Sequence, residues 1–279
     1  MTDEEIFLID CGEGTQSRMS ENKIKRSKIN HIFISHLHGD HCFGLPGLIT
    51  SYNLYQRSET LYLYGPVGLR AFIDVILSAT GTKLNYDLVI HEHDTQIQQV
   101  VVERQHVRVS TIPLEHRIPT AGYLFTEKTA PRKINGEAVA RYGVPFDMME
   151  GLRHGSHWTS KEGTTIDNAV LTTQGRPPFT FAYCSDTVYL PSLVHSIRGV
   201  DLLYHEATFA KETGTNARRW GHSTATEAAL IAKEAQVGKL LIGHFSGRYA
   251  DPEVLGEEAR ETFRNTIVAR EGMVIHFSQ

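Results

Sequence analysis

The sequence of 279 residues has no long hydrophobic run and few cysteines. Apolar residues nowhere continue for the roughly 18 positions that a membrane-spanning helix needs. The acidic start, MTDEEIFLID, does not have the basic and apolar regions of a signal peptide. The cysteines Cys11, Cys42 and Cys184 are too widely spaced for a disulfide framework or a Cys-x-x-Cys metal site. We therefore expect a cytoplasmic protein with buried thiols.

The chain also lacks an excess of positive charge, internal repeats and coiled-coil heptads. Its net charge of -4 means that a nucleic acid would have to be held by local basic patches or by metal ions. A hydrophobic content of 41% is ordinary for a folded protein with a sizeable core. Composition therefore predicts one large or two small domains and no particular partner.

Short apolar stretches alternate with amphipathic ones, which is typical of layered α/β proteins. Helices are predicted over 67–78, over the stretch opened by Thr224, and over Pro252 to Ile267, where apolar residues recur every fourth position. A capping box formed by Thr224 and Glu227 places His222 in the loop before its helix. Strands are predicted at 6–9, 32–34, 61–64, 107–112, 179–183, 202–204, 240–242 and 274–277.

The run His36-Leu37-His38-Gly39-Asp40-His41 directly follows a buried strand. Its imidazoles and carboxylate are the donors that zinc prefers. Alternation would point His36 and His38 to one side, and a tight turn at Gly39 could bring Asp40 and His41 around a second metal. A lone His-x-His would be explained by ordinary surface histidines, but this longer pattern favours a metal-dependent hydrolase.

Further donors occur in the same context, just beyond predicted strands: His116, Asp186 and His244. Each taken alone could be a capping aspartate or a structural histidine, but their shared position favours convergence on one metal site. Glu206 and His222 could form an oriented proton donor that binds no metal. His205, beside Glu206, is interpreted as a packed strand residue.

The segment Thr126 to Gly175 breaks the alternation, with prolines, glycines, mixed charges and little periodicity. We predict an arm inserted into a single domain that spans residues 1–279. Its portion from Arg153 to Lys161 mixes cations, histidines and Trp158 without an acid, which suits a nucleic-acid backbone. An exposed loop without a partner is the alternative.

Together these residues resemble the ribonuclease Z family, the tRNA 3′-processing endonucleases of the metallo-β-lactamase superfamily, in its short form. The resemblance spans nearly the whole chain. His-x-His-x-Asp-His alone is typical of the superfamily, whereas GEGTQ, HGDHxFGLPGL, HEATF and GHST indicate this family. The segments that carry it, in family order, are LIDCGEGTQ, HIFISHLHGDHCFGLPGL, PLEHRIPTAGYLF, FAYCSDT, LYHEATF, GHSTATEAA and LIGHFSGRY.

The resemblance implies an αββα sandwich of two mixed sheets flanked by helices, and two Zn²⁺ ions per subunit. It assigns His36, His38 and His116 to one zinc, Asp40, His41 and His244 to the other, and Asp186 to both. Asp40 would position or deprotonate the attacking water. His222, oriented by Glu206, would protonate the departing 3′-oxygen, and Ser246 and Arg248 would lie near substrate phosphate.

The resemblance further implies a homodimer and an arm that grips precursor tRNA, with Arg153 and Lys161 as candidate contacts. Family chains begin with additional strands and a glycine turn before the segment matching LIDCGEGTQ, so we expect these first strands to be missing here. Two alternatives stay open: a phosphodiesterase for small or cyclic phosphodiesters, and a truncated homologue that binds RNA without cutting it.

Overall fold

The computed structural model describes residues 6–128, 132–174 and 177–276. They form two compact units: unit 1 comprises the described residues of 1–103, 109–125 and 180–276, and unit 2 those of 104–108 and 126–179. Among these residues, every helix is too short or too polar to cross a bilayer. Cys11, Cys42 and Cys184 are free and buried, as predicted.

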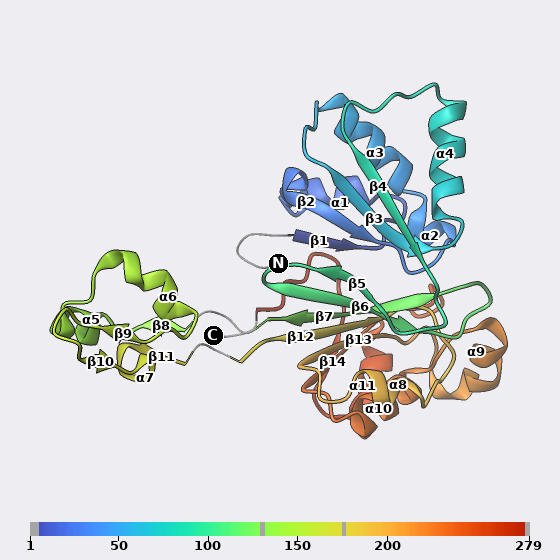
Figure 1. Ribbon diagram of the computed structural model, residues 1–279. Helices are drawn as coiled ribbons and strands as arrows, with labels where there is room; N and C mark the ends of the chain where they lie inside the picture. The colour runs from blue at the N-terminus through green and yellow to red at the C-terminus, as the bar shows by residue number, and fades with distance from the viewer. Residues whose placement is uncertain (1–5, 129–131, 175–176, 277–279) are drawn as a thin grey trace. The chain divides into compact units, whose positions relative to one another are not determined.

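The first sheet of unit 1 has four strands in the order β1-β2-β3-β4, and every pair is parallel (Figure 1). Parallel neighbours require crossover connections, which here include helices. Ile32, Leu63 and Leu48 belong to the core that the sheet shares with these helices. The elements are β1 (Ile6–Ile9), α1 (Thr15–Glu21), β2 (Ile29–Phe33), α2 (Gly39–Cys42), α3 (Leu45–Leu54), β3 (Leu61–Pro66), α4 (Leu69–Ala79) and β4 (Leu88–His93).

The second sheet has seven strands in the order β15-β14-β13-β12-β7-β6-β5. Strands β12 to β15 pair in parallel. A tight turn joins β5 and β6, in which the N–H of Arg104 donates to the carbonyl of Val107 (2.9 Å). These two strands are therefore antiparallel, and the sheet is mixed. The strands are β5 (Val100–Glu103), β6 (Val107–Pro113), β7 (Ala121–Glu127), β12 (Thr180–Cys184), β13 (Leu202–Glu206), β14 (Lys239–Gly243) and β15 (Thr266–Val268).

The helices on the second sheet are short, and α10 (Ala225–Glu234) is nearly all small residues on its buried side. Alanines allow α10 to approach β13 and β14 closely, and the predicted capping box of Thr224 and Glu227 is present. Around it lie α8 (Leu193–Ser196), η3 (Lys211–Thr213), α9 (Gly214–Trp220) and α11 (Glu253–Thr262).

Aromatic rings join the two sheets of unit 1. Phe33 of β2 lies 5.1 Å from Tyr123 and 5.3 Å from Phe125 of β7, measured between ring centroids. Phe7 of β1 lies 5.7 Å from Phe125. The sheets therefore pack face to face with helices outside them, as the αββα prediction requires.

Two sequence predictions about elements were wrong. The helix predicted to reach Ile267 ends at Thr262, and Ile267 pairs with Leu241 in the second sheet. There, strand pairing overrides the four-residue periodicity. The strand predicted at 274–277 is absent over 274–276, and residue 277 lies outside the described residues.

Unit 2 has a small core of its own, built on Val144, Leu152 and Leu171. The buried amide of Asn168 donates to the carbonyls of Leu152 (2.7 Å) and Ser156 (2.8 Å) and ties its turns together. Its elements are two to seven residues long, which explains why periodicity did not reveal them. They are β8 (Lys133–Ile134), α5 (Gly136–Tyr142), η2 (Phe146–Met148), α6 (Met149–Arg153), β9 (Trp158–Thr159), β10 (Thr165–Ile166), α7 (Asn168–Leu171) and β11 (Thr172–Thr173).

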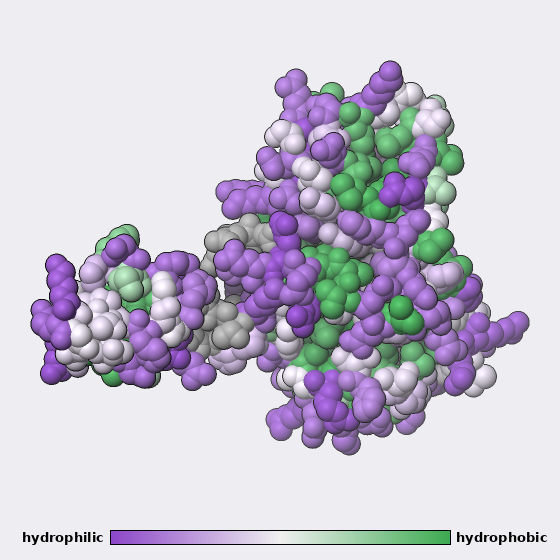
Figure 2. Space-filling model, viewed as in Figure 1, coloured by the Kyte–Doolittle hydropathy of each residue, from purple (hydrophilic) through white to green (hydrophobic). Residues whose placement is uncertain are grey.

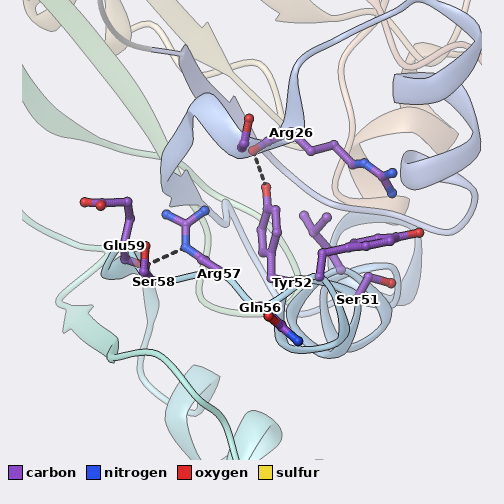
Figure 3. Close-up of a pocket in the computed structure, with 10 residues that line it drawn as sticks. Arg26, Ser51, Tyr52, Gln56, Arg57, Ser58 and Glu59 are labelled. Atoms are coloured by element: carbon purple, nitrogen blue, oxygen red, sulfur yellow. Dashed lines mark hydrogen bonds between the residues drawn. The ribbon is translucent and has the colours of Figure 1, made fainter.

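A pocket opens beside the carboxyl end of α3 and contains two arginines and two tyrosines (Figure 3). The guanidinium of Arg57 lies over the ring of Tyr52 at 4.8 Å. It also donates to the carbonyls of Glu59 and Ile29 and to the side chain of Asn30. The hydrogen-bonding capacity of Arg57 is therefore used to hold the chain between α3 and β3.

Apolar side chains also reach the surface of unit 1, as Figure 2 shows over the region of α3 and α4. Val67, Val75 and Leu54 are exposed in this region. Scattered apolar residues are normal on a protein surface, but a contiguous patch is typical of an interaction surface.

Candidate metal centre

The polar residues singled out in the sequence lie where strands of unit 1 end. Asp186 follows β12, Glu206 is the last residue of β13, and His244 follows β14. Because these three strands are parallel, their carboxyl ends meet at one edge of the second sheet. His116 follows β6, and the His36–His41 run follows β2 of the first sheet.

The His36–His41 run is irregular up to His38 and then enters α2 at Gly39. A short helix thus replaces the tight turn predicted there. The loop after β1 packs against it: the N–H of Cys11 donates to the carbonyl of His41 (2.7 Å). A Cβ on Gly12 would stand 2.0 Å from the carbonyl oxygen of Asp40, so only glycine permits this approach.

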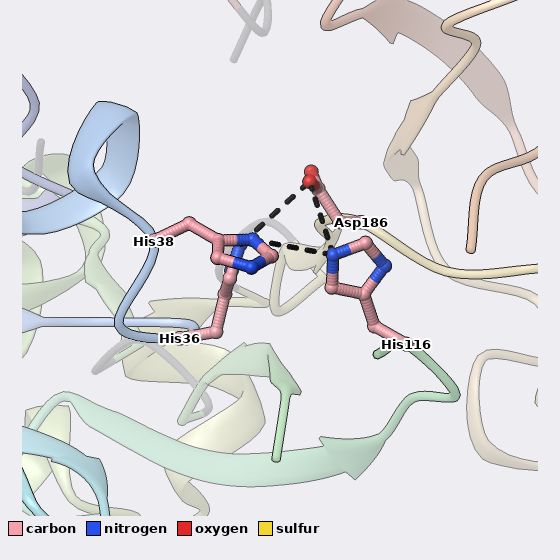
Figure 4. A group of neighbouring side chains, drawn as sticks. All are labelled: His36, His38, His116 and Asp186. Atoms are coloured by element: carbon pink, nitrogen blue, oxygen red, sulfur yellow. Dashed lines mark hydrogen bonds and ion pairs between the residues drawn. The ribbon is translucent and has the colours of Figure 1, made fainter. Parts of the chain in front are cut away.

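The first group of donors consists of His36, His38, His116 and Asp186 (Figure 4). Nδ1 of His38 lies 3.0 Å from Nε2 of His36 and 3.3 Å from Nε2 of His116. Oδ2 of Asp186 lies 3.7 Å from His36 Nε2 and 3.8 Å from His116 Nε2. Four donor atoms from four separate positions in the sequence thus face a common point.

The second group consists of Asp40, His41 and His244. Nε2 of His41 lies 3.4 Å from Nε2 of His244, and both nitrogens lie 3.5 Å from Oδ2 of Asp40. The other oxygen of Asp186, Oδ1, is 3.5 Å from His41 Nε2 and 3.3 Å from His244 Nε2. The carboxylate of Asp186 therefore offers one oxygen to each group.

These spacings fit metal ions. Zinc held tetrahedrally at about 2.0–2.1 Å sets its ligand atoms about 3.3–3.4 Å apart, close to the separations in both groups. Oδ1 of Asp186 is buried and has no hydrogen-bond partner among the described residues, which is costly unless a cation faces it. Imidazole nitrogens that face one another at about 3 Å likewise require a shared cation or proton between them.

The histidines of the first group are held neutral, the form that binds metal. Burial, together with the neighbouring His41 and His38, lowers the pKa of His36 to about 2. Burial is also the main reason that the pKa of His38 and the pKa of His116 are lowered. Protons therefore compete little with a metal at this group near neutral pH.

The second group behaves differently because carboxylates surround it. Burial by itself lowers the pKa of His244, but the hydrogen bond with Asp40 and the charges of Asp186 and Glu206 outweigh burial and raise it to about 9. The hydrogen bond with His244 correspondingly holds the pKa of Asp40 below its usual value, against the effect of burial. Without a metal, a proton occupies this group.

The donor histidines are oriented by partners on their other ring nitrogens. Nδ1 of His41 donates to Oδ2 of Asp10 (2.8 Å), and Nδ1 of His116 donates to the carbonyl of Gly221 (2.6 Å). Nδ1 of His244 lies 3.0 Å from the hydroxyl of Thr208. Such partners set the tautomer and direct the remaining nitrogen at the metal.

Sequence reasoning missed Asp10, although it follows β1 just as the predicted donors follow their strands. Its carboxylate accepts the N–H of Ser35 (2.7 Å) and the hydroxyl of Tyr183 (2.9 Å). Asp10 and His244 also both adopt positive φ, 56° and 59°. Such strained backbone in non-glycine residues tends to occur at functional sites.

Glu206 and His222 are in contact. Nδ1 of His222 donates to Oε1 of Glu206 (2.9 Å), whose fully buried carboxylate also accepts the hydroxyl of Thr208 (2.7 Å). Burial by itself raises the pKa of Glu206. The opposing effects, of which the hydrogen bond from His222 is the largest, outweigh burial and lower the pKa. His222 lies in the loop before α10, as predicted, and its ring centroid is 5.1 Å from that of His116.

His205 points away from this pair: it is fully buried in β13, and its Nδ1 donates to the carbonyl of Glu206 (2.7 Å). This is the packed strand residue that the sequence indicated. His222 also belongs to a third set of neighbouring donors, with Asp186 and His244. Because Nδ1 of His222 is already bonded to Glu206, the set does not replace the two groups above.

The predicted substrate contacts lie in different places. Ser246 follows His244, and its N–H donates to the carbonyl of Thr208 (3.1 Å). The exposed guanidinium of Arg248 lies over the ring of Phe209 at 4.8 Å. Arg153 and Lys161 are exposed in unit 2, at the end of α6 and in the turn between β9 and β10.

The basic and aromatic mix of unit 2 is only partly available to a ligand. Trp158 packs on the small core of this unit. His154 lies 2.9 Å from Glu150, and His157 lies 3.5 Å from Asp167. Acids thus face these histidines, and within 153–161 the exposed lysine and arginine are Arg153 and Lys161.

Sequence comparison finds close relatives over nearly the whole chain. The chain is 46% identical to a protein named ribonuclease Z from Bacteroides fragilis over 272 residues, which is 98% of this chain and 90% of that protein. It is 47% identical to ribonuclease Z of Porphyromonas gingivalis, with the same coverage. A sequence model of another family, the anti-Pycsar protein Apyc1, matches residues 1–128.

Structural comparison agrees. The crystal structure of the short form of human tRNase Z aligns with a TM-score of 0.71 and 28% identity, covering 100% of this chain and 91% of the human one. The metallo-β-lactamase fold protein YhfI from Bacillus subtilis aligns with a TM-score of 0.66 and 19% identity, covering 99% of this chain and 89% of YhfI. The second likeness concerns the fold alone.

Proposed function

The chain belongs to the ribonuclease Z family, and from this we propose that it is an endoribonuclease that removes the 3′ trailer from precursor tRNA. The products are a 3′-hydroxyl on the tRNA and a 5′-phosphate on the trailer. The observation that supports this chemistry most directly is the carboxylate of Asp186, which lies between two groups of metal donors at one strand edge.

The proposed cofactor is a pair of zinc ions. His36, His38 and His116 would hold one, Asp40, His41 and His244 the other, and Asp186 both. When bound, the ions stabilise charge on the attacking and leaving oxygens of an in-line displacement and make water more acidic. Imidazole and carboxylate donors without a thiolate suit zinc, and the near-tetrahedral spacing supports this choice.

Side chains of the protein then orient the attacking water, donate the proton and bind the substrate. Asp40, ionised and partly exposed, accepts a hydrogen bond from the attacking water and orients it toward phosphorus. The oxygen–phosphorus bond to the tRNA 3′-oxygen breaks, and His222 gives that oxygen its proton. Glu206 holds the ring of His222 in place by accepting the N–H of its Nδ1. Ser246 and Arg248 bind phosphate oxygens beside this pair.

Unit 2 supplies recognition in this proposal, with Arg153 and Lys161 contacting the tRNA backbone. We also propose that the enzyme is a cytoplasmic homodimer in which the arm of one subunit holds tRNA that the other subunit cleaves. Light scattering coupled to gel filtration tests the dimer, which predicts twice the mass of 31.3 kDa.

The deciding experiment incubates the zinc-loaded protein with several precursor tRNAs and maps the cleavage position. Cutting just after the discriminator base, with a 5′-phosphate on the released trailer, is expected. An Asp40→Ala variant serves as the control for a contaminating nuclease. Absence of cleavage from a preparation that holds about two zinc ions per chain would contradict the proposal.

A phosphodiesterase for small or cyclic phosphodiesters is the second candidate, since the metal centre alone does not select the size of the diester. It predicts faster turnover of a cyclic nucleotide than of precursor tRNA. Deleting residues 126–175 separates the two: the tRNA endonuclease loses precursor cleavage but keeps turnover of a chromogenic diester, whereas the phosphodiesterase keeps its turnover of cyclic nucleotides.

A further inference from the structure

Three exposed arginines of unit 1 lie near the loop that carries His222. Arg117 follows His116, Arg219 lies in the last turn of α9, and Arg248 follows Ser246. Among the described residues, the guanidiniums of Arg117 and Arg248 make no hydrogen bond or ion pair. Exposed positive charge without a carboxylate beside it is notable in a chain whose net charge is -4.

Arg117 lies close to the loop that carries His222, because its neighbour His116 binds that loop. The ring of His116 donates to the carbonyl of Gly221, and a Cβ on Gly221 would stand 3.3 Å from Cγ of Arg117. The side chain of Arg117 therefore runs along the loop that carries His222. Its charge also acts on His38, whose pKa is lowered by burial first and by Arg117 second.

Arg248 is linked to the same loop through two aromatic rings. Its guanidinium is stacked over two aromatic rings, 4.8 Å from the centroid of Phe209 and 5.7 Å from that of Trp220. The ring of Phe209 is 6.0 Å from that of His222. Trp220 ends α9 two residues before His222. The stack restricts the motion of Arg248 without using its N–H donors, which remain available to a ligand.

We propose that Arg117 is a substrate-positioning residue, which binds a backbone phosphate of the RNA beside the scissile bond. Arg248 would hold another phosphate, so both arginines would bind RNA near the proton donor. This inference rests on the proposed endoribonuclease function. Neither the sequence motifs nor the donor groups assign a role to Arg117.

The chemistry favours a phosphodiester chain over an isolated anion. A small diester has one phosphate, which the metal donors and His222 engage, and it leaves no second charge for Arg117. A polynucleotide has a phosphate at every nucleotide, so engaging the scissile one brings its neighbours to the rim of the site. Arg117 therefore discriminates between long and small diesters and does not take part in bond breaking.

The test compares Arg117→Ala, Arg117→Lys and wild type on precursor tRNA and on bis(p-nitrophenyl) phosphate. For Arg117→Ala, KM for the precursor should rise about tenfold, and the slope of log affinity against log salt should become shallower by about 0.7 to 0.9, as loss of one phosphate contact requires. Arg117→Lys keeps the charge and should recover most of both effects. Filter binding of the precursor to metal-free protein measures the salt slope without turnover.

Arg198→Ala is the matched control, because Arg198 is also exposed and lies before β13, at the opposite edge of the same sheet. It should leave the KM and the salt slope unchanged. If Arg117 merely supported His116 or His38, Arg117→Ala would lower zinc content and turnover of both substrates alike, and this result overturns the inference. So does an unchanged KM and salt slope in an active enzyme. A wild type that cuts no precursor overturns the proposed function as well.

Discussion

The edge of unit 1 that carries the two donor groups and the body of unit 2 are built in opposite ways. At the edge, carboxylates and imidazoles are buried together: Glu206 is fully buried, and Asp186 is 3% exposed. In unit 2, the candidate functional side chains Arg153 and Lys161 are exposed and stand on elements of a few residues. In the proposed function, chemistry takes place where the scaffold holds side chains rigidly, and recognition takes place where charge is accessible.

This difference has an energetic cause. Metal ligands that stay neutral or unpaired without a cation must be held in position by the rest of the protein. Parallel strands do this, because their carboxyl ends lie together at one rigid edge of the sheet. Contacts to a nucleic-acid backbone need only a side chain that is long and positively charged. Each contact adds little binding free energy by itself, and many contacts add together. Substitutions at the edge should therefore cost far more than substitutions in unit 2.

The largest effect is expected for Asp186→Ala. Both donor groups lose an oxygen, so both metals should dissociate, and cleavage should fall by more than about 10⁴-fold because each ion supplies several kcal/mol to the transition state. Elemental analysis and precursor cleavage measure the two losses. Asp201→Ala is the control, since Asp201 binds Thr180 at the other end of the same strands. Full metal content in Asp186→Ala would contradict the assignment.

His222→Ala should keep its metals and lose about 10²- to 10⁴-fold in precursor cleavage, the usual contribution of a general acid. The loss should be much smaller on a p-nitrophenyl diester, because nitrophenolate leaves without a proton. Parallel rates on the two substrates measure this selectivity. An equal loss on both would show that His222 does not protonate the leaving oxygen.

Acid should weaken the metal affinity of the second donor group about 50-fold between pH 9 and pH 7, because a metal must displace the proton that a pKa of about 9 keeps on His244. Each pH unit below that pKa costs about tenfold in affinity. The first group should change little, since the pKa of His36 is about 2. Zinc titration against a chelator at several pH values measures both sites, and two flat profiles would contradict the difference.

Asp10→Asn should weaken the metal of the second group by about 10- to 100-fold, the usual effect of losing the partner that orients a ligand histidine. The amide has one acceptor oxygen, so it cannot accept from both Ser35 and His41 as the two carboxylate oxygens do. Tyr183→Phe, which removes one hydrogen bond to Asp10 but keeps its charge, should have a smaller effect. Zinc affinity that is equal in Asp10→Asn and wild type would show that Asp10 is only structural.

The smallest effect is expected in unit 2. Arg153→Ala combined with Lys161→Ala should raise KM for precursor tRNA several-fold and make the salt dependence shallower by about one unit per lost phosphate contact. Turnover of a small diester provides the internal reference. If KM and salt slope stay constant while the enzyme is active, RNA is held elsewhere, and the arm is an exposed module without a partner.

Sequence and structure agree best where a local pattern had one physical meaning. The capping box at Thr224 and Glu227 sets a helix start by hydrogen bonds within four residues, so it was predictable. Ile267 was assigned to a helix because its spacing fitted one, and its pairing with Leu241 depends on a strand 26 positions away. Asp10 was missed for a similar reason, since its partner His41 lies 31 residues further along the chain.

The sequence by itself determined the class of chemistry and the donor types, because imidazole and carboxylate side chains at strand ends can be read from local pattern alone. Only the tertiary structure decided which oxygen of Asp186 faces which donor group, why His244 holds a proton and His36 does not, and that Arg117 runs beside Gly221. These depend on distances of a few ångströms between residues far apart in the chain. Electrostatic and hydrogen-bonding energies change steeply over such distances, and no local pattern encodes them.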